Sequence, residues 1–277
     1  MTQGGIGAMR WIGRLMAKAT AEESGKGPRE VTADMAAAYE ASVRGDYAAA
    51  LELWTPLAHA GVPRAQNNIG ACFAEGLGVE QDESLALRWL TLAAGAGDPV
   101  GQRNLAALYF KGVGGEPDYT KAAELYRLSA EAGDAPAQDM LSWMLLEGEA
   151  IPFDHAGAFR WARAAAEQGV ASSMTRLGMI FHNALGVDRD PLQAAQWWAK
   201  GAAAGDADGQ AMLGAAHCLG SGVPRDPVRA LALLLRAQAN CSALADPFIP
   251  AARKALSTEE IAEAKRRAAA AELEPAA

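Results

Sequence analysis

The side chains best suited to catalysis or metal binding are scattered through this sequence. The four histidines, His59, His155, His182 and His217, are far apart, and no two stand four residues apart as a helical zinc site would require. No cysteines have zinc-ligand spacing, and there is no G-x-S-x-G turn, Walker loop or dinucleotide-binding glycine motif. The sequence therefore predicts no catalytic residue, no metal site and no cofactor.

Five aspartates do recur at a regular interval, and regularly placed carboxylates could serve as general acids or bases. They are Asp82, Asp118, Asp154, Asp190 and Asp226. Each precedes a stretch with the apolar spacing of a helix. An aspartate in that place accepts hydrogen bonds from the unpaired amides of the first helical turn. We therefore interpret these aspartates as helix caps and not as acid–base pairs.

The aspartates belong to a longer pattern that repeats every 36 residues without insertion or deletion. Self-similarity at a fixed period of this length indicates a solenoid, in which each unit contacts only its neighbours. The five matching segments are residues 62–97, 98–133, 134–169, 170–205 and 206–241.

Each repeat has the pattern of two helices joined by a glycine loop. In the first half, Leu177 and Phe181 are four residues apart and so share one helical face, with the small Gly178 beside them. The loop glycines suit the left-handed conformation that ends a helix. In the second half, a large residue such as Trp161 or Trp197 is expected to be buried.

The full pattern is A-x-x-x-L-G-x-x-Y-x-x-G-x-G-V-x-x-D-x-x-x-A-x-x-W-x-x-x-A-A-x-x-G, and it resembles the Sel-1-like repeat family, a relative of tetratricopeptide repeats. It stands most fully in residues 62–97 and 170–205. The resemblance implies an all-α, right-handed α/α solenoid of paired antiparallel helices. It also implies a non-enzymatic scaffold or adaptor that binds a protein or peptide.

The same resemblance raises an alternative function. Some relatives in a secreted, cysteine-rich branch of the family have been associated with binding or hydrolysing β-lactams, so a hydrolase-type enzyme is the rival hypothesis. That branch has a disulfide in each repeat, whereas this chain has only Cys72, Cys218 and Cys241, in unlike repeat positions. Free thiols favour a reducing compartment, and we expect a cytoplasmic monomer.

The overall charge and hydropathy exclude two further classes of protein. The formal net charge is −8, which disfavours binding to a nucleic-acid backbone. No continuous apolar stretch approaches the roughly 20 residues that a membrane span needs. The sequence therefore predicts neither a nucleic-acid-binding protein nor a transmembrane protein.

The composition divides the chain into three parts. We expect a mobile, weakly amphipathic tail at 1–30, a solenoid at 31–241 with one incomplete opening unit and five full repeats, and capping helices at 242–277. Within the tail, residues 8–20 place apolar and basic side chains on different helical faces. That segment is alternatively a targeting element or a weak membrane-surface contact. The latter would make the protein a membrane-tethered assembly factor with a peripheral membrane location.

The partner is expected on the concave face, which the first helix of each repeat lines. Trp143 is the most distinctive residue there: it lines a groove, or it fills a void left by the unusual loop 149–152. Arg103 and Arg176 flank the apolar centre and could pair with acidic residues of the partner. The candidate binding residues are Arg64, Asn67, Asn68, Arg103, Asn104, Phe110, Met140, Trp143, Leu146, Arg176, Met179 and His182.

Overall fold

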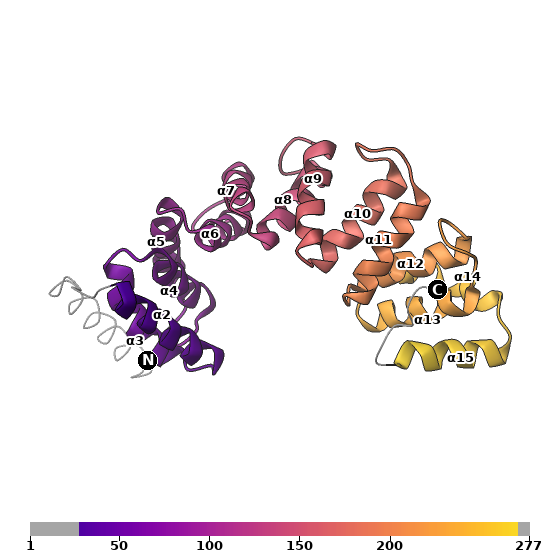
Figure 1. Cartoon of the computed structure of the whole chain (residues 1–277), viewed down its shortest axis with the longest axis horizontal. Coiled ribbons are helices and arrows are strands. Elements are labelled where there is room, and N and C mark those ends of the chain that lie inside the picture. Colours follow the sequence, from indigo (N-terminus) through magenta and orange to yellow (C-terminus); the bar gives the residue numbers. More distant parts are fainter. Residues whose placement is uncertain (1–27, 271–277) are drawn as a thin grey trace. The chain divides into compact units, whose positions relative to one another are not determined.

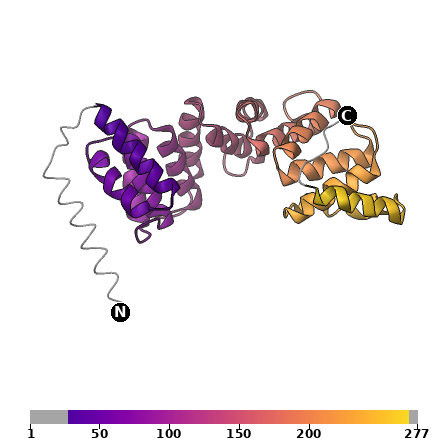
Figure 2. The same cartoon turned by 60° about the horizontal axis from the view of Figure 1, so that its bottom comes forward.

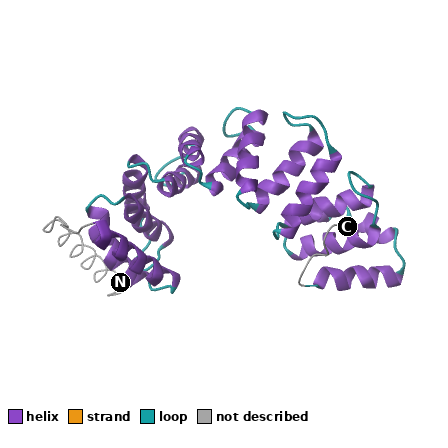
Figure 3. Cartoon of the chain, in the orientation of Figure 1, coloured by secondary structure: helices purple, strands orange, loops and turns teal. Residues whose placement is uncertain are grey.

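A computed structural model describes residues 28–270 of the chain, and all regular structure in this range is helical (Figure 1, Figure 3). The expectations for the tail at residues 1–27 and for the last seven residues lie outside the described residues. None of the described helices is long and apolar enough to cross a membrane.

The chain divides into two compact units, residues 1–137 and 138–277, and each is described by itself. The first unit begins with α2, and α8 contains the boundary. Its helices are α2 (Pro28–Val43), α3 (Tyr47–His59), α4 (Pro63–Glu75), α5 (Glu83–Gly95), α6 (Pro99–Lys111), α7 (Tyr119–Glu131) and the start of α8 (Ala135–Glu147).

The second unit continues the same alternation and ends in shorter elements. Its helices after α8 are α9 (His155–Glu167), α10 (Ala171–Asn183), α11 (Pro191–Ala203), α12 (Ala207–Leu219), α13 (Pro227–Ala239), the 3₁₀ turn η1 (Ala243–Ala245), α14 (Ile249–Lys254) and α15 (Thr258–Ala269).

Consecutive helices pack as pairs, and this confirms the predicted helical-repeat solenoid class. The first helix of a repeat packs on its own second helix, as α4 does on α5 and α10 on α11, and on the second helix of the repeat before it. First helices of neighbouring repeats also contact each other, as α4 contacts α6 and α10 contacts α12. Within each unit the pairs follow one another in chain order (Figure 2). We call the surface formed by these first helices the first-helix face.

The aspartates that precede the second helices are caps, as the sequence predicts. The carboxylate of Asp82 accepts a hydrogen bond from the amide of Leu85, and Asp190 accepts one from the amide of Gln193. In the opening unit, Asp46 of the Arg-Gly-Asp turn caps α3 in the same way. A cap of this kind stabilises the start of a helix by about 1 kcal/mol. The recurring aspartate therefore marks the start of the second helix in each period of 36 residues.

The first helices end in the left-handed conformation, as the loop glycines predict. Gly76, Gly112 and Gly220 have φ values of 69°, 75° and 71° at this position. Ala184 occupies the equivalent place with φ 56°. A side chain makes this conformation unfavourable, by roughly 1–2 kcal/mol per residue. The fourth repeat therefore keeps the turn geometry without the residue that suits it.

The core forms where the small residue of each first helix meets a large residue of the second. Gly70 lies against Leu90, and Gly178 against Trp198, so a side chain on either glycine would overlap its neighbour. Here the sequence analysis was right for Trp89, which is buried, but wrong for the tryptophans of the third and fourth repeats. Trp161 and Trp197 are only half-buried, because the fully buried side chains lie one position further along each second helix.

The two ends of the array differ from the sequence expectation in one detail. Pro28, expected in the mobile tail at 1–30, is the first residue of α2, where its missing amide hydrogen costs no helical hydrogen bond. At the other end, a capping box is present: Ser257 Oγ accepts from the amide of Glu260, whose carboxylate accepts from the amide of Ser257. It begins α15, which packs against α13.

Candidate functional site

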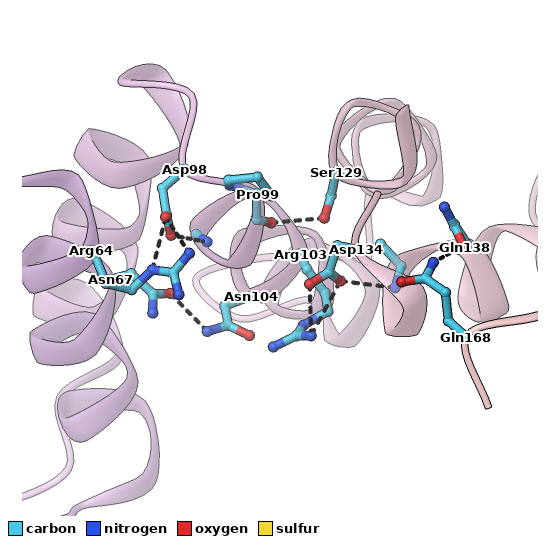
Figure 4. A network of polar contacts seen from close by, with 12 residues as sticks. Arg64, Asn67, Asp98, Pro99, Arg103, Asn104, Ser129, Asp134, Gln138 and Gln168 are labelled. Carbon is cyan, nitrogen blue, oxygen red and sulfur yellow. Dashed lines mark hydrogen bonds and ion pairs between the residues drawn. The ribbon is translucent and has the colours of Figure 1, made fainter. Parts of the chain in front are cut away.

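In the first unit, the first-helix face carries arginines that are held by the next repeat. The guanidinium of Arg64, on α4, contacts the Asp98 carboxylate, with 2.9 Å from Nε to Oδ1 (Figure 4). Asp98 also accepts a hydrogen bond from the amide of Gly101, 2.8 Å away, and so caps α6. The Asp98 carboxylate thus caps the N-terminus of α6 and also joins α6 to Arg64 of the preceding repeat.

The same arrangement recurs one repeat later. Arg103, on α6, donates to both carboxylate oxygens of Asp134 at 3.2 Å. Asp134 accepts in turn from the amide of Ala137 at the start of α8 (Figure 4). The side chain of Arg103 is 26% exposed and that of Asp134 is 10% exposed. This pair is therefore partly buried, and salt screens it less than an ordinary surface ion pair.

Three asparagines form a chain of amides across α4 and α6. Asn104 donates from Nδ2 to Oδ1 of Asn67 at 2.8 Å (Figure 4). Asn67 donates to the side chain of Asn68 at 3.1 Å. Asn67 is buried, whereas Asn68 and Asn104 are half-buried. At the loop end of α6, the half-buried Phe110 packs edge-on against Tyr119, with ring centroids 5.1 Å apart.

In the second unit the ion pair between repeats has its two charges exchanged. The acid Asp139 lies on α8, and Arg176 of α10 pairs with it. Ser173 of α10 also donates to Asp139. The exchange has a local reason: the residue before α10 is Val170, which has no carboxylate to offer. Arg103 and Arg176 thus both pair with carboxylates of this chain, whereas the sequence analysis considered pairing with acidic residues of a partner.

The centre of the face in the second unit is apolar and incompletely covered. Met140, Trp143 and Met179 are half-buried, whereas the neighbouring Leu141 and Leu177 are fully buried. Leu146 and Met179 pack with one side against the core of the unit. These side chains are therefore neither ordinary core residues nor freely solvated ones.

His182 and His217 have different environments in the second unit. His182 is half-buried beside Trp198, with ring centroids 5.4 Å apart, and its Nδ1 has no hydrogen-bond partner. His217 stands in the repeat position that Phe73 and Phe181 occupy in other repeats. It is buried, with Nδ1 3.0 Å from the carbonyl oxygen of Pro224. Burial lowers the pKa of His217, and the hydrogen bond to Pro224 opposes that shift.

Nucleophilic and metal-binding groups do not assemble in residues 28–270. No three side chains of His, Cys, Asp or Glu there are placed to hold a metal ion together. Burial raises the pKa of the Cys72 thiol to about 11, so the nucleophilic thiolate is disfavoured at neutral pH. The side chains brought together on the first-helix face are instead amides, ion pairs, methionines and a tryptophan, which suit binding.

A model of the family described as Sel1 repeat matches five successive segments of the chain: residues 63–98, 99–134, 135–170, 171–206 and 207–237. Since these matches cover more than half of the sequence, the chain belongs to the Sel1 repeat family. Proteins of this family are generally scaffolds for protein–protein interaction and typically are not catalysts. A search among curated proteins found no match.

One solved structure in particular agrees with this assignment. The chain is similar to a Sel1 repeat protein from Oxalobacter formigenes, with 28% identity over 87% of this chain and 99% of that one, at a TM-score of 0.75. A putative Sel1 repeat protein from Klebsiella pneumoniae is 20% identical over 72% of this chain and 97% of that one, at a TM-score of 0.46.

The polar contacts between repeats were not predicted from the sequence. A signal was present, because Arg64 stands 34 residues before Asp98, nearly one period, and Arg103 stands 31 before Asp134. Residues one period apart lie on neighbouring first helices, so opposite charges at such separations are candidates for pairing. In the exchanged pair, Asp139 stands 37 residues before Arg176, again close to one period but with the signs reversed.

Proposed function

We propose that this protein is a non-enzymatic scaffold that binds a protein or peptide on its first-helix faces. The observation that carries the proposal is the contrast between positions of the repeat. Positions that pack the two helices keep small and large residues in register, as Gly178 does with Trp198. Positions on the first-helix face change from Asn104 in the first unit to Met140 and Arg176 in the second.

The two units would contribute different chemistry to binding. In the first unit, the half-buried Asn68 and Asn104 present hydrogen-bonding groups. Arg64 and Arg103 present further donors, which are already oriented by Asp98 and Asp134. Oriented amides suit the backbone of an extended peptide, because little side-chain entropy remains to be lost on binding. In the second unit, Met140, Trp143 and Met179 suit the apolar face of an amphipathic helix or an apolar peptide side chain.

Trp143 is the residue on which we place the largest share of the binding free energy. It is half-buried and stands where other repeats have Ala71, Ala107 and Ala215. A large aromatic ring within a methionine-rich surface is typical of an interface hot spot. In this reading it lines a groove, and it is not required to fill the space beneath the loop 149–152.

Affinity capture from the native cell tests the proposal. Wild-type protein and a Trp143→Ala variant are used as bait, and Leu192→Ala serves as the matched control. Leu192 is 57% exposed on the second helix α11, away from the first-helix face. The proposal expects one set of proteins captured by wild type and by Leu192→Ala but depleted with Trp143→Ala. Equal capture by all three baits contradicts it.

A further inference from the structure

The second unit has a cavity at the end of the array, where the terminal helix α15 packs against α13 (Figure 1). Its volume is about 850 Å³, and it is lined by α13, α15 and the junction between α11 and α12. Alanines make up half of its lining residues, and their short side chains leave the space unfilled. Ligand pockets measure roughly 300–1,000 Å³, so this one is large enough for a small molecule. We call it the α13–α15 cavity.

The charged side chains that line the α13–α15 cavity are both cationic. They are Arg236 of α13 and Lys265 of α15, and no aspartate or glutamate is among the described residues that line it. The chain as a whole carries a net charge of −8, so this surface departs from the rest of the protein. A hollow lined by charge of one sign attracts ligands of the opposite sign.

The ammonium group of Lys265 is available to a ligand. Lys265 is exposed and forms no ion pair with a described residue. On the same helix, the acid Glu263 is already paired with Arg266 and Arg267. None of the residues one helical turn away from Lys265 is acidic; they are Ile261, Ala262, Ala268 and Ala269.

The guanidinium of Arg236 is fixed in position by the end of α15. Nε donates to the carbonyl oxygen of Ala268 and Nη2 to that of Arg267, each at 3.1 Å. Nη2 also donates to the carbonyl oxygen of Ala270. Because backbone carbonyls are uncharged, they orient the guanidinium and leave its positive charge in place. Nη1 donates to no described residue and remains for a ligand.

Two amide side chains add neutral donors to the same cavity. Gln210 is 3% exposed, and its Nε2 lies 3.5 Å from the carbonyl oxygen of Ala202. In the first full repeat, the equivalent Gln66 makes this contact with Ala58 at 3.0 Å. Nδ2 of Asn240 lies 3.4 Å from Oε1 of Gln210. Both contacts are longer than the usual 2.7–3.2 Å, so the two amides would gain from a closer acceptor.

We propose that the α13–α15 cavity binds a small organic phosphate ester, with the phosphate between Arg236 and Lys265 and the organic part against the alanines. A phosphate monoester carries a charge of about −1.5 to −2 at pH 7, which matches the two cations. Its three terminal oxygens can accept from Nη1 of Arg236, from Lys265 and from the two amides. A carboxylate has a single charge and two oxygens, and it would satisfy fewer of these donors.

This site is separate from the proposed protein-binding surface. None of the candidate binding residues of the first-helix face lines the α13–α15 cavity. The two proposals can therefore fail independently of each other.

Isothermal titration calorimetry of the full chain tests the proposal. The probe is phenyl phosphate; benzoate offers the same ring with a carboxylate, and benzyl alcohol offers it without charge. Phenyl phosphate should bind saturably at low salt and more weakly at high salt, because salt screens the attraction. Benzoate should bind more weakly and benzyl alcohol not measurably. Absence of saturable phenyl phosphate binding overturns the proposal, and so does equal affinity for benzoate.

Lys265→Gln removes one cation from the cavity and should weaken phenyl phosphate binding about tenfold, the scale of one hydrogen bond to a charged group. Lys254→Gln is the matched control, because it makes the same change of charge at an exposed lysine of α14 that does not line the cavity. Its affinity should be that of wild type. Equal losses in the two variants would mean attraction by overall charge and no site. Arg236 is left unchanged, since its hydrogen bonds hold the end of α15.

Ala239→Leu tests the location without changing charge. Ala239 is exposed and lines the cavity, so a leucine there takes up space that the ligand needs. Ala251→Leu, at an exposed position of α14 outside the cavity, is the control. We expect phenyl phosphate binding to be lost in Ala239→Leu and kept in Ala251→Leu. Wild-type affinity in an Ala239→Leu chain that melts as wild type does would overturn the proposal.

Discussion

Gly178 lies directly beneath the indole ring of Trp198, where a methyl group on the glycine would overlap Cδ1 and Nε1 of the ring. Trp198 is 2% exposed. The first and second helices of the fourth repeat approach this closely only because position 178 has no side chain. The contact between Gly178 and Trp198 explains why this repeat has a small residue directly after the buried Leu177.

Gly178→Ala is expected to destabilise the protein by about 1–3 kcal/mol, the usual cost of overpacking a core. Urea unfolding followed by circular dichroism measures the change. Gly95→Ala is the matched control, because nothing lies within 4 Å of a methyl group there. It should not destabilise the protein, since alanine favours a helix over glycine by up to about 1 kcal/mol.

A rescue distinguishes overpacking from other damage. In the second full repeat, Ala106 stands in the place of Gly178 and Tyr126 in the place of Trp198, and both are buried. The double variant Gly178→Ala with Trp198→Tyr copies that pair and should regain part of the lost stability. If Gly178→Ala is as stable as wild type, the close approach of the two helices is not required.

Gln66 and Gln102 each have a buried Oε1 that finds no hydrogen-bond partner among the described residues. The equivalent Gln138 accepts a hydrogen bond from Gln168, 2.9 Å away, 30 residues further along (Figure 4). The corresponding residue for Gln66 is Ala96. Ala96→Gln should therefore supply the missing donor and stabilise the fold by about 1 kcal/mol, as measured by the urea midpoint.

The repeat itself provides the control for this prediction. Ala204 stands in the same column, but its counterpart 30 residues earlier is Met174, which has no oxygen to satisfy. Ala204→Gln should leave stability unchanged. Equal gains from Ala96→Gln and Ala204→Gln would mean that the effect comes from the surface and not from the buried oxygen.

Among residues 28–270, two residues other than glycine have positive φ, Ala184 at 56° and Cys241 at 64°. Cys241 occupies the closing position of the repeat, where Gly169 and Gly205 have φ 92°. Cys241→Gly and Ala184→Gly should each stabilise by about 0.5–1 kcal/mol, since relief of backbone strain exceeds the added freedom of the unfolded chain. The reverse change Gly220→Ala should destabilise, and thermal melting of the three variants decides the matter.

Stability should fall as the pH drops below 6.5, the ordinary pKa of histidine. Burial lowers the folded-state pKa of both His217 and His59, so the unfolded chain binds protons more readily in this range. His217→Phe copies Phe73 and Phe181 of the same column and should flatten the pH dependence of the urea midpoint. An unchanged slope would show that His217 does not contribute to it.

Elements of regular structure were predictable because their signals recur at every period. Asp82 and Asp190 mark helix starts and Gly76 and Gly220 mark helix ends, and each acts through local backbone geometry that the sequence specifies. The burial of Trp198 in place of Trp197 was not predictable in this way. Adjacent apolar residues differ by 100° around a helix, and the choice between them depends on how the neighbouring helix packs.

The helices that carry the candidate residues were predictable, but the contacts of those side chains were not. Period and helix order place Arg103 and Arg176 on first helices. Whether a guanidinium faces solvent or a carboxylate of the chain depends on Asp134 and Asp139, which come from neighbouring repeats. Such contacts require the packing of one repeat on the next, and only the structure supplies it.

The most direct test of the binding-scaffold account is a titration of Trp143→Ala with a partner captured by wild-type protein, together with its melting temperature. The account predicts an affinity loss of about 2 kcal/mol or more, the scale of an interface hot spot, with the melting temperature nearly unchanged. Leu192→Ala should bind as wild type does. If Trp143→Ala instead lowers the melting temperature strongly and the folded fraction binds with full affinity, then Trp143 is a core residue and the account is wrong.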